Sequence, residues 1–296
     1  VTLETDDHSA SCEITDFHTN VTLLERDGQV LLRGTAGDSK AETDHSVLSV
    51  EEILAFADAV DPAEIRETIG RQIEYNTAIS REGLNCHWGA EVGRTILNMH
   101  SEGDLIARAC AAASAGSDAR MSGCNKPVVI VSGSGNQGMT ASLPVIEYAR
   151  AMNADGELLL RALVVADLIT IHQKTPIGRL SAFCGAVSAG CGAAAGIAYL
   201  YGGRYDEVAH TIANTLAICS GMICDGAKPS CAAKIASAVN AGLMGYQMYL
   251  NGHHEFVGGE GIIKKGVENT IDSVGRLARC GMKQTDSEIL NIMVGR

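Results

Sequence analysis

The sequence has 296 residues, of which 46% are hydrophobic but only 4% aromatic, so we expect a core built from alanine and aliphatic side chains. Its formal net charge of −12 argues against nucleic acid or an anionic membrane surface as a partner, because both bind basic faces. Ten cysteines without a recognisable secretory signal favour a reducing, cytoplasmic setting. In that setting, clustered cysteines more often bind metal or do chemistry than form disulfides.

The N-terminal residues predict a small β-containing piece. Residues 10–34 alternate polar and apolar side chains, and the pair Asp27-Gly28 lies between "VTLLER" and "QVLLRG". Because Asp-Gly readily adopts the positive φ of a tight turn, this pattern indicates a β-hairpin. Two strands alone are only marginally stable, so we expect the piece to pair with the rest of the chain or with a further segment.

The pattern becomes helical at Ser49, which forms a capping box with Glu52. We therefore place a domain boundary near residue 48. Residues 1–48 form the β-containing piece, and residues 49–296 form a large Ala/Gly-rich helical domain that holds the candidate site. The predicted fold class is α+β, mostly α.

Further helices are expected where apolar residues recur three and four positions apart, over 62–83, 89–116 and 156–175, with Pro176 ending the last of them.

The stretch 179–203 runs for more than twenty residues without charge, which invites a transmembrane interpretation. It is rich in Ala and Gly and poor in Leu, Ile and Phe, so a buried and closely packed helix is favoured. Near the end of the chain, Thr285 and Glu288 predict a second capping box at the start of the final helix.

The stretch "VVIVSGSGNQGMTASLP" contains Gly133-x-Gly135-x-x-Gly138, the spacing of dinucleotide-binding turns. Such folds need a strand, a glycine turn, a helix and a second strand that ends in an acidic residue. Residues 127–131 could form the first strand, but a long helical pattern stands where the second strand should be. An NAD(P)-binding oxidoreductase is therefore the weaker interpretation.

The same turn can serve a different ligand, because a Gly/Ser-rich turn that opens a helix presents free backbone N–H groups to an anion. Ser132, Ser134, Asn136 and Gln137 add side-chain donors, which suits a small carboxylate substrate. A connector whose polar residues only satisfy one another is the alternative.

Five of the ten cysteines fall between residues 184 and 231. Cys184 and Cys191 are seven positions apart, on one face of the uncharged helix, and Cys224 lies in a Gly/Asp loop. Pro229 predicts Cys231 at the start of a helix, where the dipole and free N–H groups favour a thiolate. Three such cysteines could converge on an iron–sulfur cluster. Alternatively, these cysteines are small hydrophobic residues of the core.

Together, "ASAGSDARM", "SGSGNQGMTASLP", "RLSAFC" and "SGMICDGAKPSCAAK" resemble the L-cysteine desulfidase family, which is related to the α-chain of bacterial iron–sulfur L-serine dehydratases. The resemblance extends from "FHTNVTLLERDG" to "QTDSEILNIM", nearly the whole chain. It implies an oxygen-sensitive enzyme with a 4Fe-4S cluster and without pyridoxal phosphate. It places the cluster ligands at Cys184, Cys224 and Cys231 and leaves Cys191 and Cys219 out of the ligand set.

The resemblance also implies a mechanism. An open iron acts as a Lewis acid on a small amino-acid substrate, a base removes the α-proton, and sulfide leaves the β-carbon of cysteine, or hydroxide that of serine. The resulting aminoacrylate hydrolyses to pyruvate and ammonia.

Several residues are candidates for the substrate site in this scheme. Arg120 suits a fork-like contact with the substrate carboxylate, with an interhelical ion pair as its alternative role. Ser134, Asn136 and Gln137 are expected to line the site. His172 is a candidate proton carrier or supporting group, or else a hydrogen-bonded histidine of the core. Arg179, just before the uncharged helix, is expected to balance the charge of the cluster.

The chain departs from the family pattern in one respect. Family members carry an N-terminal segment with a Cys-Thr-Glu-Pro motif, whose cysteine is the proposed base, and the motif does not occur here. We therefore expect that the chain is a fragment, that the segment is present as a separate polypeptide, or that this protein works differently. The alternative that the protein is a non-catalytic iron–sulfur or thiol module stays open. It predicts bound iron whose spectrum does not change when substrate is added. The Ala/Gly-rich helical region is compatible with a homodimer.

Overall fold

A computed structural model describes residues 1–15, 20–34, 43–178, 181–252, 256, 259 and 261–296. The chain divides into two compact units, Val1–Asp44 and His45–Arg296, and each is described by itself. Arg179, the residue expected to balance cluster charge, lies outside the described residues.

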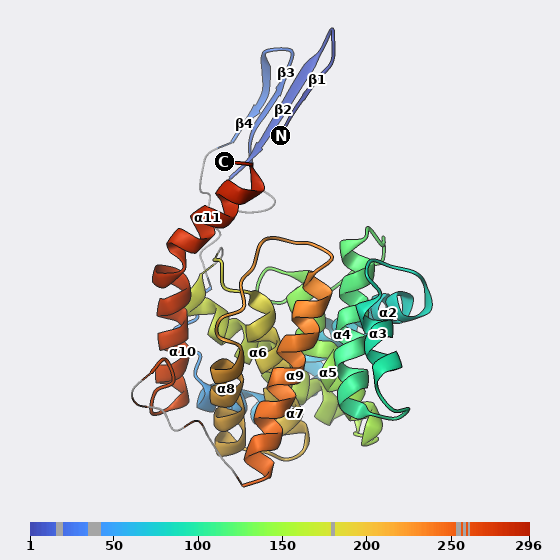
Figure 1. Ribbon diagram of the computed structural model, residues 1–296, viewed down its shortest axis with the longest axis vertical. Helices are drawn as coiled ribbons and strands as arrows, with labels where there is room; N and C mark the ends of the chain where they lie inside the picture. Colours follow the sequence, from blue (N-terminus) through green and yellow to red (C-terminus); the bar gives the residue numbers. More distant parts are fainter. Residues whose placement is uncertain (16–19, 35–42, 179–180, 253–255, 257–258, 260) are drawn as a thin grey trace. The chain divides into compact units, whose positions relative to one another are not determined.

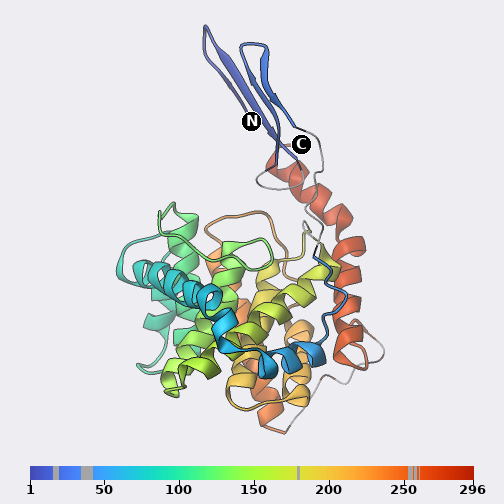
Figure 2. The same ribbon diagram turned by 180° about the vertical axis from the view of Figure 1, so that it is seen from behind.

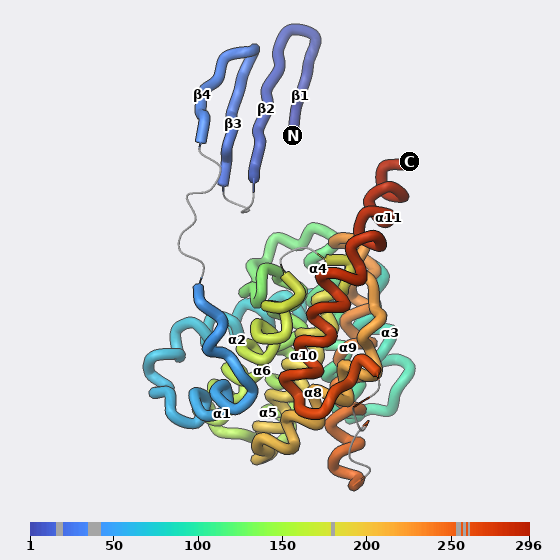
Figure 3. Tube along the Cα trace, turned by 90° about the vertical axis from the view of Figure 1, so that its left-hand side faces the viewer, coloured from blue at the N-terminus to red at the C-terminus, as the bar shows by residue number. Residues whose placement is uncertain are grey.

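The first unit is an antiparallel sheet with the strand order β1-β2-β3-β4 (Figure 3). The predicted hairpin is confirmed, because Asp27 and Gly28 join β3 to β4 with φ values of 50° and 76°. Two more strands extend the hairpin into a meander, which supplies some of the pairing that two strands alone would lack. The strands are β1 (Thr2–Glu4), β2 (Ser9–Ile14), β3 (Val21–Arg26) and β4 (Gln29–Arg33).

The second unit is helical, so the predicted α+β, mostly α class is confirmed (Figure 1). The predicted cap is also confirmed, since the Ser49 hydroxyl accepts a hydrogen bond of 3.1 Å from the Glu52 N–H at the start of α1. The helices are α1 (Val50–Ala59), α2 (Pro62–Asn85), α3 (Val92–Met99), α4 (Leu105–Met121), α5 (Gly135–Ala151), α6 (Gly156–Ile177), α7 (Gly185–Leu200), α8 (Tyr205–Cys219), α9 (Cys231–Leu250), α10 (Val267–Arg276), the π-helical turn η1 (Leu277–Gly281) and α11 (Lys283–Met293).

Helix α7 lies in the centre of this unit. Every one of its residues from Ala186 to Leu200 is buried, and it packs against α5, α6, α8 and α9. Helices α1 and α2 cover α6 on the side seen in Figure 2. The charge-free stretch is thus a buried helix, as predicted, and among the described residues no helix is long and apolar enough to cross a membrane.

Three details of the helical prediction are wrong. The stretch 89–116 falls into two helices, because Gly103 turns the chain at a φ of 89° and Asp104 caps α4. Helix α6 continues through Pro176, whose ring lies in the last turn against Gly275 of α10. Helix α11 begins two residues before Thr285, which therefore lies in the first turn and is not the cap.

Two glycines of α2 test how closely the helices pack. A Cβ on Gly83 would overlap the Ala115 carbonyl oxygen of α4, whereas a Cβ on Gly70 would meet no atom within 4 Å. We expect Gly83→Ala to lower the free energy of unfolding by about 1–3 kcal/mol, because α4 must move. Gly70→Ala should raise it by about 0.5–1 kcal/mol, because alanine is the better helix former. Urea unfolding of both variants measures the difference, and equal effects would contradict the packing.

Candidate active site

The glycine turn before α5 is tight and leaves the helix start open. Ser132 and Gly133 have φ values of 44° and 88°, and Val131 and Ser134 exchange backbone hydrogen bonds of 3.1 and 3.3 Å. Ser134 is the N-cap of α5, but its side chain makes no capping hydrogen bond. Residues 127–131 form no strand beyond the single bridge from Val131. The strand that a dinucleotide fold requires is therefore missing, and an anion-binding turn is favoured.

Arg120 lies at the same helix start. Its Nη1 donates to the Asn136 side-chain oxygen at 3.2 Å, and its Nε is so close that a Cβ on Gly135 would lie 2.7 Å away. A cation next to the positive end of a helix dipole is unfavourable unless an anion joins them. The pairing of Arg120 with the start of α5 therefore forms a site suited to a carboxylate.

Gln137 connects this turn to α7. Its Oε1 accepts a hydrogen bond of 2.6 Å from the Ser132 hydroxyl, and its side chain packs on Gly185, where a Cβ would lie 2.6 Å from Gln137 Cδ. Gly185 directly follows Cys184. The structure thus brings the glycine turn next to the first cysteine of the predicted ligand set.

Cys184 and Cys224 lie in direct contact. Cys184 is the N-cap of α7, one residue before the helix begins. Its N–H donates to the Met222 carbonyl at 3.0 Å, and the Cys224 N–H donates to the Ala182 carbonyl at 2.6 Å. These bonds hold the two segments side by side, and the two thiols form a hydrogen bond with each other.

The electrostatics of the pair favour one thiolate. The hydrogen bond to Cys224 raises the pKa of Cys184, and burial raises it further. The same hydrogen bond lowers the pKa of Cys224, against the opposing effect of burial. Lys234 of α9 attracts both thiolates. Burial lowers the pKa of Lys174 of α6, which also faces the two sulfurs.

Cys231 is the first residue of α9, as predicted. Its Sγ accepts a hydrogen bond of 3.4 Å from the Lys228 N–H and lies 3.8 Å from the Gly226 carbonyl oxygen. In the part of the chain that the structure describes, no three His, Cys, Asp or Glu side chains come together as a metal site. Cys231 is connected to Cys224 through the backbone of the turn 224–231, and its side chain does not join the other two thiols in a three-residue cluster.

The chemistry of these donors fits an iron–sulfur cluster. Cys184 and Cys231 lie at the positive ends of α7 and α9, and Lys174 and Lys234 add positive charge beside the thiols. Such surroundings stabilise thiolates and the anionic clusters that they bind.

The cysteines that the resemblance leaves out have other surroundings. Cys191 is fully buried in α7, and its thiol lies 3.8 Å from the Ile212 carbonyl oxygen. Burial raises the pKa of Cys191 to about 12 and also raises that of Cys219. These two thiols have the character of core residues.

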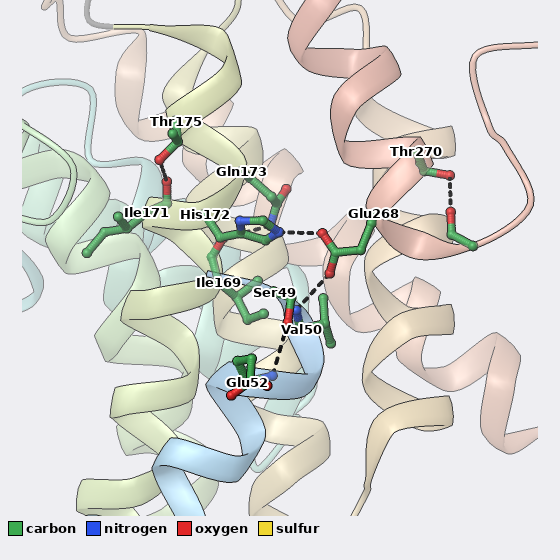
Figure 4. Close-up of polar contacts among 11 residues, drawn as sticks. Ser49, Val50, Glu52, Ile169, Ile171, His172, Gln173, Thr175, Glu268 and Thr270 are labelled. Carbon is green, nitrogen blue, oxygen red and sulfur yellow. Dashed lines mark hydrogen bonds and ion pairs between the residues drawn. The ribbon is translucent and has the colours of Figure 1, made fainter. Parts of the chain in front are cut away.

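His172 belongs to a different contact. Its Nε2 lies 2.6 Å from the Glu268 carboxylate of α10, whose other oxygen accepts a hydrogen bond of 2.7 Å from the Val50 N–H at the start of α1 (Figure 4). No hydrogen bond among the described residues connects His172 to the glycine turn or to the cysteines. Two helix positions separate His172 from Lys174, which directs the two side chains to opposite sides of α6.

Sequence reasoning missed the charged residues around the thiols. Asp225, Lys228 and Lys234 all lie in the motif "CDGAKPSCAAK" that drew attention for its cysteines, so their spacing was visible. Lys174 gave no such signal, because it stands in a helical pattern far from the cysteines in sequence. Only the packing of α6 on α7 brings it to them.

The geometry can be compared with known proteins. The family model of the serine dehydratase alpha chain matches residues 13–291. The chain belongs to the serine dehydratase alpha-chain family. It is 55% identical to a UPF0597 protein of Desulfitobacterium hafniense over 100% of this chain and 69% of that protein. A UPF0597 protein of Lachnoclostridium phytofermentans is 50% identical, over 99% of this chain and 70% of the relative.

A third relative, a UPF0597 protein of Fusobacterium nucleatum, is 46% identical over 95% of this chain and 67% of its own length. No solved structure matches the chain. The family places the chain among the dehydratase-type lyases, in agreement with the serine dehydratase part of the resemblance.

The thiol pair predicts selective reactivity in iron-free protein. We expect iodoacetamide at pH 7 to modify Cys224 well before Cys110 and Cys191, because burial raises the pKa of each of those two thiols to about 12. Cys184→Ala removes the hydrogen bond that lowers the pKa of Cys224, so modification of Cys224 should slow by about threefold or more. Peptide mass spectrometry follows each thiol. Cys219→Ala is the matched control, and a Cys184→Ala rate equal to that of the control would contradict the pairing.

The Glu268 contact predicts a pH dependence of stability. Burial opposes the charged carboxylate, but hydrogen bonds from His172 and the Val50 N–H lower its pKa below the usual 4.5. A lowered pKa contributes stability above the unfolded-state value, and this contribution is lost as the pH falls through the folded-state pKa. The Glu268 side chain is 41% exposed. We therefore expect Glu268→Gln to cost only about 1 kcal/mol at pH 7.

This cost should shrink as the pH falls from the unfolded-state pKa, near 4.5, through the lower folded-state pKa of Glu268. Thermal unfolding between about pH 3 and pH 8 measures the cost, with Glu102→Gln at an exposed site as the control. A cost that stays constant over this range would contradict the assignment.

Proposed function

We propose that this chain holds the cluster and the substrate site of an iron–sulfur-dependent lyase that converts L-cysteine to pyruvate, ammonia and sulfide, with L-serine deamination as a related activity. One observation carries the proposal. Gln137 packs on Gly185, which joins the anion-binding turn at the start of α5 to the Cys184–Cys224 pair. A carboxylate substrate at the turn would thus lie beside the thiols.

Each part of the site then has a role. Arg120 and the free N–H groups of α5 bind the substrate carboxylate, and Asn136 holds the guanidinium in place. Ser134 and Gln137 line the space between the carboxylate and the cysteines. This binding fixes the orientation of the α-proton and the β-substituent before any bond breaks.

We assign the cluster to Cys184, Cys224 and Cys231. Three thiolates on a 4Fe-4S cluster leave one iron free to act as a Lewis acid, which is the chemistry that the group supplies when bound. The proposal needs no pyridoxal phosphate. The positive ends of α7 and α9, together with Lys174 and Lys234, would offset the negative charge of a cluster bound to these cysteines.

His172 has a supporting role in this proposal. Its contact with Glu268 fixes α6 between α1 and α10, and so fixes the position of Lys174 on the other side of the helix. The chain covers 67–70% of the length of these relatives. We propose that the base comes from a segment that corresponds to the remaining part of the relatives. We place the reaction in the cytoplasm, because the ten cysteines are free thiols.

Anaerobic reconstitution with iron and sulfide tests the proposal. We expect about four irons per chain, and pyruvate released from L-cysteine and, more weakly, from L-serine. Cys224→Ala should lose most of the iron and all the pyruvate, because a ligand is gone. Cys191→Ala, which removes a buried thiol of α7 outside the ligand set, is the matched control and should keep the iron.

Wild-type protein that binds no iron would overturn the cluster assignment. A protein that binds iron but forms no pyruvate, even after the further segment of a relative is added in trans, would favour a non-catalytic iron–sulfur module instead.

A further inference from the structure

The loop that joins two of the proposed ligands is closed on itself. This ligand loop runs from Cys224 to Cys231 and turns at Gly226, whose φ of 91° suits only glycine. The Lys228 N–H donates to the Cys231 Sγ at 3.4 Å, and the Cys231 N–H donates to the Lys228 carbonyl at 2.9 Å. The second half of the loop is therefore tied to Cys231.

Asp225 ties the first half of the loop to the same helix. Its Oδ1 accepts a hydrogen bond of 2.6 Å from Lys234 Nζ, and its Oδ2 lies 3.8 Å from Lys228 Nζ. Lys228 Nζ also donates to the Asp225 main-chain carbonyl. Lys234 stands one turn of α9 after Cys231, and Asp225 directly follows Cys224. The Asp225 carboxylate thus connects the residue after Cys224 to α9, the helix that begins with Cys231.

The ion pair between Asp225 and Lys234 lies near the surface. The Lys234 side chain is 24% exposed and the Asp225 side chain 36%, so the contact is partly shielded from water. An ion pair of this kind contributes little to overall stability. Its main effect is to remove freedom from a short loop that a glycine would otherwise leave mobile.

We propose that Asp225 is a positioning residue, which through Lys234 and Lys228 holds Cys224 in a fixed place relative to Cys231. The inference rests on the proposed function, since it concerns two of the thiols assigned to the cluster. Residues that orient metal ligands typically change metal affinity by about 10–100-fold when they are replaced.

The test compares Asp225→Asn with Asp225→Glu and with a matched control. Glu147 of α5 also bridges two cations, Arg108 at 2.7 Å and Arg150 at 2.6 Å, and is only 15% exposed. Glu147→Gln therefore removes an equivalent carboxylate from a contact that holds no thiol, and should cost at least as much stability.

The first measurement is the rate at which reconstituted protein loses its cluster to an iron chelator, followed by visible absorbance. We expect about tenfold faster loss in Asp225→Asn, a rate nearer wild type in Asp225→Glu, and a wild-type rate in Glu147→Gln. A purely structural effect would instead follow the thermal unfolding temperatures of the variants, and would make Glu147→Gln at least as fast as Asp225→Asn. That order, or a wild-type rate in Asp225→Asn, would overturn the inference.

The second measurement needs no iron. Hydrogen exchange of the amides of residues 226–231 in iron-free protein should be about fivefold faster or more in Asp225→Asn, and unchanged in Glu147→Gln. If wild-type protein takes up no iron, the proposed function is wrong. Hydrogen exchange alone would then show whether Asp225 holds the ligand loop in place. Unchanged exchange in Asp225→Asn would overturn the inference.

Discussion

Gly192 brings α7 so close to α6 that a Cβ at this position would overlap the Thr170 hydroxyl oxygen and the Ala166 carbonyl oxygen. A chain with only 4% aromatic residues has few large side chains to fill wide gaps between helices, so its helices must approach one another in this way. Helix α7 has no charged residue and can be surrounded on all sides. Its position then decides where its N-terminal cap, Cys184, meets the rest of the unit.

Positive helix ends and cations gather around that cap. Arg120, from the last turn of α4, lies against the start of α5, whereas Cys184 and Cys231 lie at the starts of α7 and α9. Lys174 and Lys234 add two further charges. A chain with a net charge of −12 thus places a local positive field at one point, where a carboxylate and thiolates both gain from it.

The two sides of α6 make different contacts. One side carries Lys174 toward the thiols, and the other carries His172 to Glu268 and the start of α1. A histidine bonded to a carboxylate at 2.6 Å is a structural link as readily as a proton carrier, and only its surroundings distinguish the two. Here the surroundings are the ends of α1 and α10.

The sequence by itself determined the features that depend on near neighbours in the chain. The Asp27-Gly28 turn, the Ser49 cap, the buried character of α7 and the helix start at Cys231 all follow from local chemistry and from the distribution of charge. Pro176 shows the limit of local rules, because α6 includes this proline, which packs on Gly275, and ends at Ile177, two residues beyond the predicted end.

Only the tertiary structure decided which of the singled-out residues come together. It placed Arg120 at the start of α5, Gln137 against Gly185 and Cys184 against Cys224, and it took His172 to another contact. These pairings join residues from 16 to 96 positions apart, and the local pattern of a helix does not say which neighbour its face will meet. The packing of small residues around α7 supplies that information, because it permits only close approaches between particular faces.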